Sequence, residues 1–505
     1  MSDLNAVVVK SNPAGPFDAA VVGAGPNGLA AALRLQSAGL RVVVYERSGA
    51  PGGGMRTEAL TLPGFLHDTC SAVLPMALSS PAIQRLGLEA EGLRWVQPPA
   101  PFAHPRLGAP TLTLERGLDE TAQQLGVDAG RYSSWIRPFV ERWADLSADA
   151  LGPPGLPGAP ILMARFGLRA LLPAEALSRL SFRGPEARAL FAGVAGHSVL
   201  PLGRAPSAAI GLMLQAAGHA VGWPLPAGGA GALAAAMAQR FVAGGGALRL
   251  GVKVEALGAV ETEGPVLFDT GPRALAAIAG EALPAAYRAR LGRFRYGPGL
   301  FKVDWALSGP IPWTDPAALR AATVHLGDSL ESIVASEAAC WRGEVMDRPY
   351  IILVQPSLFD PSRAPAGQHT AWAYCHVPSG DPRDHTERIE AEIERHAPGF
   401  SERVRARHRS GPAELERLNP NYVGGDVNGG AADLDQLFTR PVLGWPPYAT
   451  PNPRLYLCSA STPPGGGVHG MCGDNAAGWV LRRHFGQPSP AQLEGGAGRR
   501  PSLRG

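Results

Sequence analysis

The first regular pattern of hydrophobic and polar positions lies close to the N-terminus. Residues 18–24 (DAAVVGA) form an apolar run of strand length, and residues 28–39 (GLAAALRLQSAG) place apolar positions at helical spacing and end on glycine. Residues 41–47 (RVVVYER) form a second run, rich in β-branched side chains as buried strands are. This order predicts a βαβ unit of about thirty residues.

The pattern changes near residue 95 and returns to the first style near residue 225. Further along, residues 301–307 (FKVDWAL) alternate apolar and polar positions, which predicts a half-buried antiparallel strand. Residues 385–400 (HTERIEAEIERHAPGF) predict an amphipathic helix, and residues 454–461 (RLYLCSAS) predict another apolar strand. We expect two domains, because 505 residues exceed the about 100–200 residues of one domain.

Composition narrows the classes of protein that fit the chain. The formal net charge of +3 gives no basis for nucleic-acid binding. No segment has about 18 consecutive apolar residues, and the N-terminus lacks the pattern of a secretory signal. We therefore expect a cytoplasmic protein, with peripheral membrane contact as an option. The five cysteines show neither a CxxC pair nor zinc-like spacing, so we expect free thiols and no metal site.

A glycine turn links the first predicted strand to the first predicted helix. The stretch GAGPNG matches G-x-G-x-x-G at Gly23, Gly25 and Gly28, and Glu46 ends the next strand 18 residues after Gly28. Gly23 allows the tight turn, Gly25 lets the main chain approach a pyrophosphate, and Gly28 lets helix and strand pack closely. The phosphates would lie at the helix N-terminus, and Glu46 would accept hydrogen bonds from the adenosine ribose. The motif alone does not separate FAD from NAD.

A second glycine loop bears on that choice. Gly52 and Gly53 follow the acidic strand, where the chain can cross close to the same pyrophosphate, and a nicotinamide site has no need of such a loop. This arrangement resembles the FAD-binding half of glutathione-reductase-like and amine-oxidase-like flavoproteins. Amine oxidases usually place arginine directly after the glycine pair. Here Gly54 follows and Arg56 comes later, which leaves a phosphate contact of Arg56 open.

Several further motifs occur in a fixed order along nearly the whole chain. They include GGGMRTEALTLPGF, LPAGGAGALAAAMA, FKVDWALSGPIPW, GGDVNGGAADLDQ and LYLCSASTPPGGGVHGMCGDNAA. With these motifs the chain resembles the phytoene-dehydrogenase-related flavoproteins, which include bacterial carotenoid desaturases. Within them it is similar to the subgroup around the mammalian pyridine nucleotide-disulphide oxidoreductase domain-containing protein 2, whose chemistry is diverse.

The resemblance implies an α/β fold with a Rossmann-like FAD-binding domain of the glutathione-reductase and amine-oxidase type. It also implies an α+β substrate domain that contains an antiparallel sheet. The FAD-binding domain would be built from residues 17–95, 225–295 and 430–486, and the substrate domain from residues 96–224 and 296–429. We expect residues 1–16 and 487–505 to be disordered.

The expected cofactor-binding residues come from both ends of the chain and from one strand between them. The resemblance implies that the strand LRLGVKVEAL passes the adenine and that Val254 contacts it through main-chain groups, although an ordinary core role is equally open. The complete set is Gly23, Gly25, Pro26, Asn27, Gly28, Glu46, Arg47, Gly52, Gly53, Val254, Ser461, Gly466, Gly467, Val468, His469, Gly470 and Met471.

The C-terminal turn STPPGGGVHGM precedes a helical run that begins near His469–Met471. The N-terminus of that helix would stabilise the negative charge of a reduced flavin, and the glycines would let the main chain approach the ring. His469 is the candidate catalytic residue: it would accept a proton or donate a hydrogen bond, unless it only positions the loop. We expect structural roles for His197, Asp304 and Asp426.

No second G-x-G-x-x-G follows a strand, and no redox-active cysteine pair is present. Electrons would therefore pass to a diffusible acceptor, O2 or a quinone. The sequence leads us to an FAD-dependent dehydrogenase or desaturase that removes a hydride from a C–C or C–N bond of a largely apolar small molecule, such as an isoprenoid or a secondary metabolite. The alternatives are an amine-oxidase-like or oxygen-inserting flavoenzyme, and a flavin-stabilised binding or assembly protein without turnover.

Overall fold

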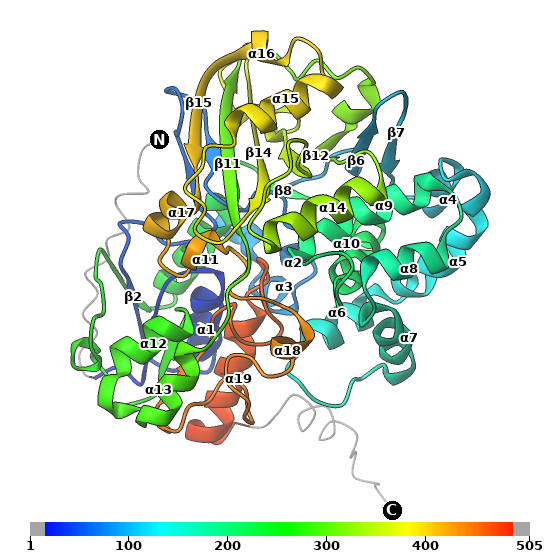
Figure 1. Ribbon diagram of the computed structural model, residues 1–505. Coiled ribbons are helices and arrows are strands. Elements are labelled where there is room, and N and C mark those ends of the chain that lie inside the picture. Colours follow the sequence, from blue (N-terminus) through cyan, green and yellow to red (C-terminus); the bar gives the residue numbers. More distant parts are fainter. Residues whose placement is uncertain (1–15, 488–505) are drawn as a thin grey trace, which may run out of the picture.

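A computed structural model describes residues 16–487, and Figure 1 shows how the elements are arranged. A five-stranded parallel sheet of order β16-β10-β1-β2-β9 lies at one end of the molecule. Its strands are β1 (Ala19–Val22), β2 (Val42–Glu46), β9 (Ala247–Leu250), β10 (Val266–Phe268) and β16 (Leu455–Leu457). Successive residues of these apolar strands point to opposite faces, so both faces need a covering layer.

Helices cover both faces of this sheet. One face packs against α1 (Pro26–Ser37), α11 (Ala230–Ala243) and α19 (Met471–Phe485), and the other packs against α12 (Pro272–Ala279) and α13 (Ala285–Gly292). The result is the three-layer arrangement of a Rossmann-like domain, as the βαβ pattern predicts. Strand β9 ends at Leu250, so the predicted strand through Val254 is shorter than expected and Val254 lies in the loop after it.

A seven-stranded sheet of order β15-β11-β14-β13-β12-β6-β7 forms the second part of the molecule. Its strands are β6 (Ala100–Arg106), β7 (Ala109–Leu114), β11 (Gly299–Leu307), β12 (Ala321–Leu326), β13 (Ile351–Val354), β14 (His369–Val377) and β15 (Val404–Ser410). Every neighbouring pair is antiparallel except β6 and β12, which are parallel.

Helices also cover both faces of the seven-stranded sheet, as the upper and right parts of Figure 1 show. The larger layer contains α4 (Leu118–Gln123), α5 (Ala129–Glu141), α6 (Trp143–Leu151), α7 (Pro160–Ala170), α8 (Ala174–Ser181), α9 (Pro185–Ala195), α10 (Ala208–Ala220) and α14 (Leu330–Trp341). The opposite face packs against α15 (Thr386–His396) and α16 (Phe400–Arg403).

Shorter elements connect the two parts. They are β3 (Thr57–Glu58), β4 (His67–Asp68), α2 (Pro75–Leu78), α3 (Pro81–Leu86), β5 (Trp95–Val96), β8 (Leu225–Pro226), α17 (Pro412–Leu418) and α18 (Leu434–Leu437). The predicted fold class is therefore confirmed as α/β with a parallel Rossmann-like sheet and a second, largely antiparallel sheet. The exact domain boundaries stay a prediction, and the disorder expected at both ends concerns residues that lie almost wholly outside the described range.

The strand β11 departs from its predicted exposure. The alternation in FKVDWAL suggested that Lys302 and Asp304 face solvent, but every residue of β11 is buried. Helix α15 covers one face, and on the other Lys302 donates a hydrogen bond to Asp304 and lies over the Trp372 ring at 4.8 Å. Although burial opposes ionisation, Lys302 and the neighbouring His408 and His67 rings hold the pKa of Asp304 below its ordinary value.

Candidate nucleotide and substrate site

The glycine turn joins β1 to α1 at the carboxyl edge of the parallel sheet. Gly23 has φ +104°, and its N–H donates to the Tyr45 carbonyl oxygen at 2.8 Å. Helix α1 begins at Pro26 after Gly25, which has no side chain to cap it, and none of the residues of its own first turn is acidic. A Cβ on Gly28 would overlap the Gly23 carbonyl oxygen, so only glycine fits there. The turn therefore presents a helix N-terminus that suits an anion.

The acidic strand end supports this turn. Glu46 is buried at the end of β2, where one carboxylate oxygen accepts from the Ala24 N–H at 2.9 Å and the other from the Ser48 N–H at 2.8 Å. These two bonds tie the glycine turn to the loop after β2. Glu46 also borders the cavity described below, so its predicted contact with a ribose remains compatible with this geometry.

The second glycine loop lies directly against the first. The Gly52 N–H donates to the Ala24 carbonyl oxygen at 2.8 Å, and a Cβ on Gly53 would stand 3.1 Å from the Gly25 Cα. The sequence prediction that both loops approach one ligand position therefore matches their packing. Arg56 borders the same cavity and donates to the Leu418 carbonyl oxygen at 3.2 Å.

One continuous cavity of about 670 Å³ runs from the glycine turn to the seven-stranded sheet. It brings together most of the predicted cofactor-binding residues from both ends of the chain. Those that line it are Gly23, Gly25, Pro26, Asn27, Glu46, Arg47, Gly53, Val254, Ser461, Gly467 and Val468. The remaining predicted residues lie outside its wall: Gly28, Gly52, Gly466, His469, Gly470 and Met471.

His469 is placed away from the cavity that a catalytic residue would have to reach. Its side chain is buried, its Nδ1 accepts from the Met471 N–H at 3.0 Å, and its carbonyl oxygen accepts from the Ser80 hydroxyl at 2.5 Å. Burial lowers the pKa of His469 to about 4, so the ring is neutral near pH 7. This arrangement favours the interpretation in which His469 holds the turn before α19.

Asp304 and Asp426 are both buried carboxyl groups with hydrogen-bond partners. Asp304 is paired within β11, as described above. Asp426 is buried and accepts from the N–H groups of Gly297, Asn428 and Gly430 at 2.7, 2.8 and 3.0 Å. It therefore organises a turn beside the cavity and does not line it.

The far end of the cavity has apolar and aromatic walls. Side chains from several elements of the second part meet there: Leu214, Trp223, Leu300, Ile352, Val354, Trp372 and Tyr374. The charged side chains that border the cavity come from the segments around the parallel sheet: Glu46, Arg47, Arg56, Lys253, Glu255 and Asp269. One end of the cavity therefore suits a polar nucleotide, and the other suits an uncharged, largely apolar molecule.

His197 borders the apolar end and is the histidine that reaches the cavity. It lies in a short 3-10 turn, Gly196–Ser198, which ends at Val199 with φ +54°, a rare conformation for a β-branched residue. Its Nε2 lies 2.8 Å from the His325 Nε2, and its ring packs edge-on against Trp223. Burial, with a smaller effect of His376, lowers the pKa of His197 to about 3.

Asp269 is a site residue that sequence reasoning missed. It directly follows β10, and its Oδ2 accepts from the Gly28 N–H at 2.8 Å. Burial, opposed by the hydrogen bonds from the turn, raises the pKa of Asp269 to about 8. The signal was present in the stretch VLFDTG, because an acidic residue at the carboxyl end of an apolar strand is where parallel sheets hold ligands.

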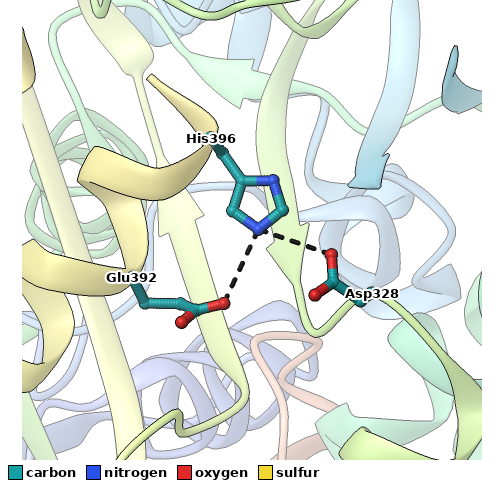
Figure 2. A group of neighbouring side chains, drawn as sticks. All are labelled: Asp328, Glu392 and His396. Atoms are coloured by element: carbon teal, nitrogen blue, oxygen red, sulfur yellow. Dashed lines mark ion pairs between the residues drawn. The ribbon is translucent and has the colours of Figure 1, made fainter. Parts of the chain in front are cut away.

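A group of ion-pairing side chains lies outside the cavity (Figure 2). Among the described residues, Asp328, Glu392 and His396 place ligand-type atoms within 4.8 Å of one another, with the His396 Nε2 3.6 Å from each carboxylate. Arg348 donates to Asp328 at 2.7 Å and to Glu392 at 2.8 and 2.9 Å. Burial opposes the ionisation of Glu392, but Arg348 and His396 hold its pKa at about 2. Arg348 thus already compensates both carboxylates, and the group is an ion-pair network.

The glycine turn on a parallel sheet, the acidic strand end and the apolar chamber define a nucleotide-binding α/β enzyme with a separate substrate region. Comparison with known proteins shows which proteins of this class the chain resembles. A family model described as "NAD(P)-binding Rossmann-like domain" matches residues 21–86. The "Pyridine nucleotide-disulfide oxidoreductase domain-containing protein 2" of Rattus norvegicus is 29% identical over 92% of this chain and 93% of its own length. The phytoene dehydrogenase of Streptomyces griseus is 29% identical over 72% of this chain and 74% of its own.

Solved structures show the same fold at lower identity. An oxidoreductase from Methanosarcina mazei aligns with a TM-score of 0.61 and 18% identity, over 92% of this chain and 99% of its own. Wild-type putrescine oxidase with bound putrescine aligns with a TM-score of 0.57 and 16% identity, over the same shares. The resemblance inferred from the motifs is therefore confirmed, and the homologues are oxidoreductases, as expected for an enzyme of this class.

Proposed function

We propose that the protein is an FAD-dependent dehydrogenase or desaturase that removes a hydride from a C–C or C–N bond of an uncharged, largely apolar small molecule. The observation that carries the proposal is the single cavity, which joins a phosphate-type glycine turn to an aromatic chamber. The phytoene dehydrogenase homologue supports a hydrocarbon such as an isoprenoid as substrate.

The residues at the turn fit the dinucleotide part of FAD. The N-cap Gly25 of α1 supplies no side-chain cap, the Asp269 carboxyl group accepts from the Gly28 N–H, and the buried Asn27 Oδ1 has no hydrogen-bond partner among the described residues. Gly25 and Gly53 let the two glycine loops pack closely here, because a Cβ on Gly25 would stand 2.5 Å from the Asp269 Oδ2 and one on Gly53 3.1 Å from the Gly25 Cα. Glu46 and the loop at Val254 would hold the adenosine, while Gly467 and Val468 would approach the ring system. The bound flavin would supply the hydride acceptor.

The protein would contribute orientation, exclusion of water and a place for the proton. The aromatic walls at Trp223, Trp372 and Tyr374 would hold a flat, apolar substrate against the cofactor end. Although the sequence suggested only a structural role for His197, this residue would accept the proton lost from the carbon next to the reacting one, because its neutral imidazole borders this end of the cavity. O2 or a quinone would reoxidise the cofactor, because the sequence has no second G-x-G-x-x-G motif after a strand that could hold a nicotinamide cofactor.

An amine-oxidase-like reaction is the second candidate, since putrescine oxidase shares the fold. The substrate end of the cavity argues against a charged amine, because none of its lining side chains within residues 16–487 is acidic and could pair with an ammonium group. An oxygen-inserting enzyme and a flavin-stabilised binding protein are further alternatives that the same experiment separates.

Anaerobic mixing of the purified flavoprotein with a panel of isoprenoids, neutral aromatics and amines tests the proposal. We expect an apolar member to bleach the visible flavin absorption and to yield a product lighter by two hydrogens. Reduction by amines alone would favour the amine-oxidase reaction, and a product that gains oxygen in air would favour insertion. A flavin that stays oxidised with every candidate would favour a binding role, and a chain that binds no FAD would overturn the proposal.

Replacing His197 by asparagine is expected to slow flavin reduction by about 10²-fold, the usual contribution of a positioned acid–base group. Because the pKa of His197 is lowered to about 3, its ring stays neutral, and the wild-type rate should show no inflection from about pH 5 to 8. Stopped-flow spectroscopy across this range measures both effects. The matched control is His369→Gln, a half-exposed histidine that does not line the cavity. An equal loss in both variants, or an inflection near the ordinary histidine pKa, would contradict the role of His197.

Peripheral membrane contact remains part of the proposal, since it would deliver an apolar substrate. None of the described helices is long and apolar enough to cross a membrane. However, Ile161 and Leu168 on α7 are 70% and 76% exposed, and Arg165 between them is exposed as well. Leu168→Glu should weaken co-sedimentation with phosphatidylglycerol vesicles about tenfold, because a charge replaces an apolar side chain that would insert into the membrane surface. Val127→Glu, at another exposed site, should leave it unchanged. Equal vesicle binding by the wild type, Leu168→Glu and Val127→Glu would show that α7 is not the membrane contact.

A further inference from the structure

Asp269 occupies the centre of the nucleotide turn, although nothing in the glycine motif requires an acidic residue there. Its N–H donates to the Val22 carbonyl oxygen at 2.8 Å, which fixes it at the carboxyl ends of the neighbouring strands β1 and β10. Its side chain is 9% exposed and borders the cavity. The residue is therefore held by the sheet itself and cannot swing far from the turn.

The carboxyl group of Asp269 lies inside the glycine loop. Its Oδ2 accepts from the Gly28 N–H at 2.8 Å, and a Cβ on Gly25 would stand 2.5 Å from the same oxygen. Gly28 belongs to the first turn of α1, whose N–H groups are the ones that dinucleotide-binding turns offer to phosphate. The carboxyl group thus shares one small space with any pyrophosphate bound at this turn.

The charges around Asp269 do not favour a carboxylate beside a diphosphate. Among residues 16–487, no ion pair involving Asp269 is formed, and the negative charge of Glu46 at the end of β2 also disfavours ionisation of Asp269. The titratable groups that face it from β16 and α19 are the buried thiols of Cys458 and Cys472, whose pKa values burial raises, so they remain neutral. Two like charges this close repel strongly in a poorly solvated site.

We propose that Asp269 acts as a neutral carboxyl group in the cofactor site: one oxygen accepts from the Gly28 N–H, and the protonated oxygen donates a hydrogen bond to a phosphate oxygen of the dinucleotide. This inference rests on the proposed function, because it assumes that FAD binds at this turn. It assigns to Asp269 a binding role that also sets the pH range in which the cofactor is held.

The electrostatics support this assignment. Burial, with a smaller effect of Glu46, raises the pKa of Asp269 to about 8 in the chain without ligand, so the group is neutral near pH 7. A bound diphosphate adds negative charge and raises this pKa further. As pH rises above about 8, the free chain loses the proton that the complex retains. Affinity should therefore fall by up to tenfold per pH unit until the pKa of the complex is reached.

A fluorescence titration of the flavin-free full chain with FAD, from about pH 6 to 9.5, tests the inference. We expect the wild type to lose affinity above about pH 8, and Asp269→Asn to bind about as tightly at pH 7 without this decline, because an amide N–H replaces the donor. Asp269→Ala should bind more weakly at pH 7. The control Glu263→Gln, at a fully exposed acid that does not line the cavity, should keep the wild-type slope. A pH-independent wild type, or the same decline in Asp269→Asn, would overturn the inference.

A second measurement does not depend on FAD. The infrared spectrum of the flavin-free wild type at neutral pH, minus that of Asp269→Asn, should contain the C=O stretch of one protonated carboxyl group. Absence of this band would overturn the inference even if FAD binds. Presence of the band in a chain that never binds FAD would instead indicate that the proposed function fails while Asp269 is neutral as assigned.

Discussion

A Gly25→Leu chain is expected to bind no FAD. Gly25 has φ −72°, a value that any residue adopts, so the main chain tolerates the change. The new side chain would enter the space between the N-terminus of α1 and Asp269, since its Cβ alone would stand 2.5 Å from the Asp269 Oδ2. That space is where the pyrophosphate would lie, and we expect affinity for FAD to fall at least about a thousandfold, or about 4 kcal/mol.

Fluorescence titration with FAD measures this loss, and circular dichroism of the flavin-free chain shows whether the fold is kept. Gly49→Leu is the matched control, because Gly49 lies in the loop after β2 and a Cβ there would meet no atom within 4 Å. The control should bind FAD as the wild type does. Tight binding by Gly25→Leu would mean that the phosphates lie elsewhere.

Gly473→Ala is expected to destabilise the fold strongly, although it adds a single methyl group. Gly473 lies in the first turn of α19, and a Cβ there would overlap the Asn27 carbonyl oxygen in α1. Because the obstacle is main chain, α1 and α19 would have to separate. We expect the free energy of unfolding to fall by about 3 kcal/mol, the upper end of the usual cost of overpacking.

Urea titration followed by circular dichroism measures that change. Gly478→Ala is a control within the same helix, where a Cβ would approach only the Arg482 side chain, at 3.7 Å. It should be neutral or stabilising by up to about 1 kcal/mol, because alanine is the better helix former. If both variants lost the same stability, the close contact of α1 and α19 would not be the cause.

The elements near the glycine turn were predictable because local pattern determines them. A β-rich run, a turn that needs glycine and a helix with a defined end occur within residues 18–47, and the packing of Gly23 and Gly28 follows from that order. The order of the motifs along nearly the whole chain then made the fold class predictable as well. The glycine loop at Gly52–Gly53 and the C-terminal turn were likewise correctly brought to one cavity, at least through Gly53, Gly467 and Val468.

The substrate end was less predictable because it depends on contacts between distant segments. His197 and His325 are 128 residues apart and meet only because α9 packs on the seven-stranded sheet. Lys302 and Asp304 looked exposed, since alternation along one strand does not reveal that both faces of its sheet are covered. His469 is the catalytic candidate because of its place in the turn, but the sequence does not reveal that Ser80, 389 residues earlier, bonds its carbonyl oxygen and holds this turn.

The order of strands in the parallel sheet has a consequence for how the protein is made. Strand β16, at Leu455–Leu457, pairs with β10, and α19 then packs on α1 from the opposite end of the chain. Until these last elements leave the ribosome, β10 is an open sheet edge and one side of α1 is uncovered, both of which invite aggregation. The nucleotide-binding part is therefore the first part of the protein to be synthesised and the last to be complete. Nascent chains should depend on chaperones for most of their synthesis, and premature termination should yield insoluble protein even when the glycine turn is intact.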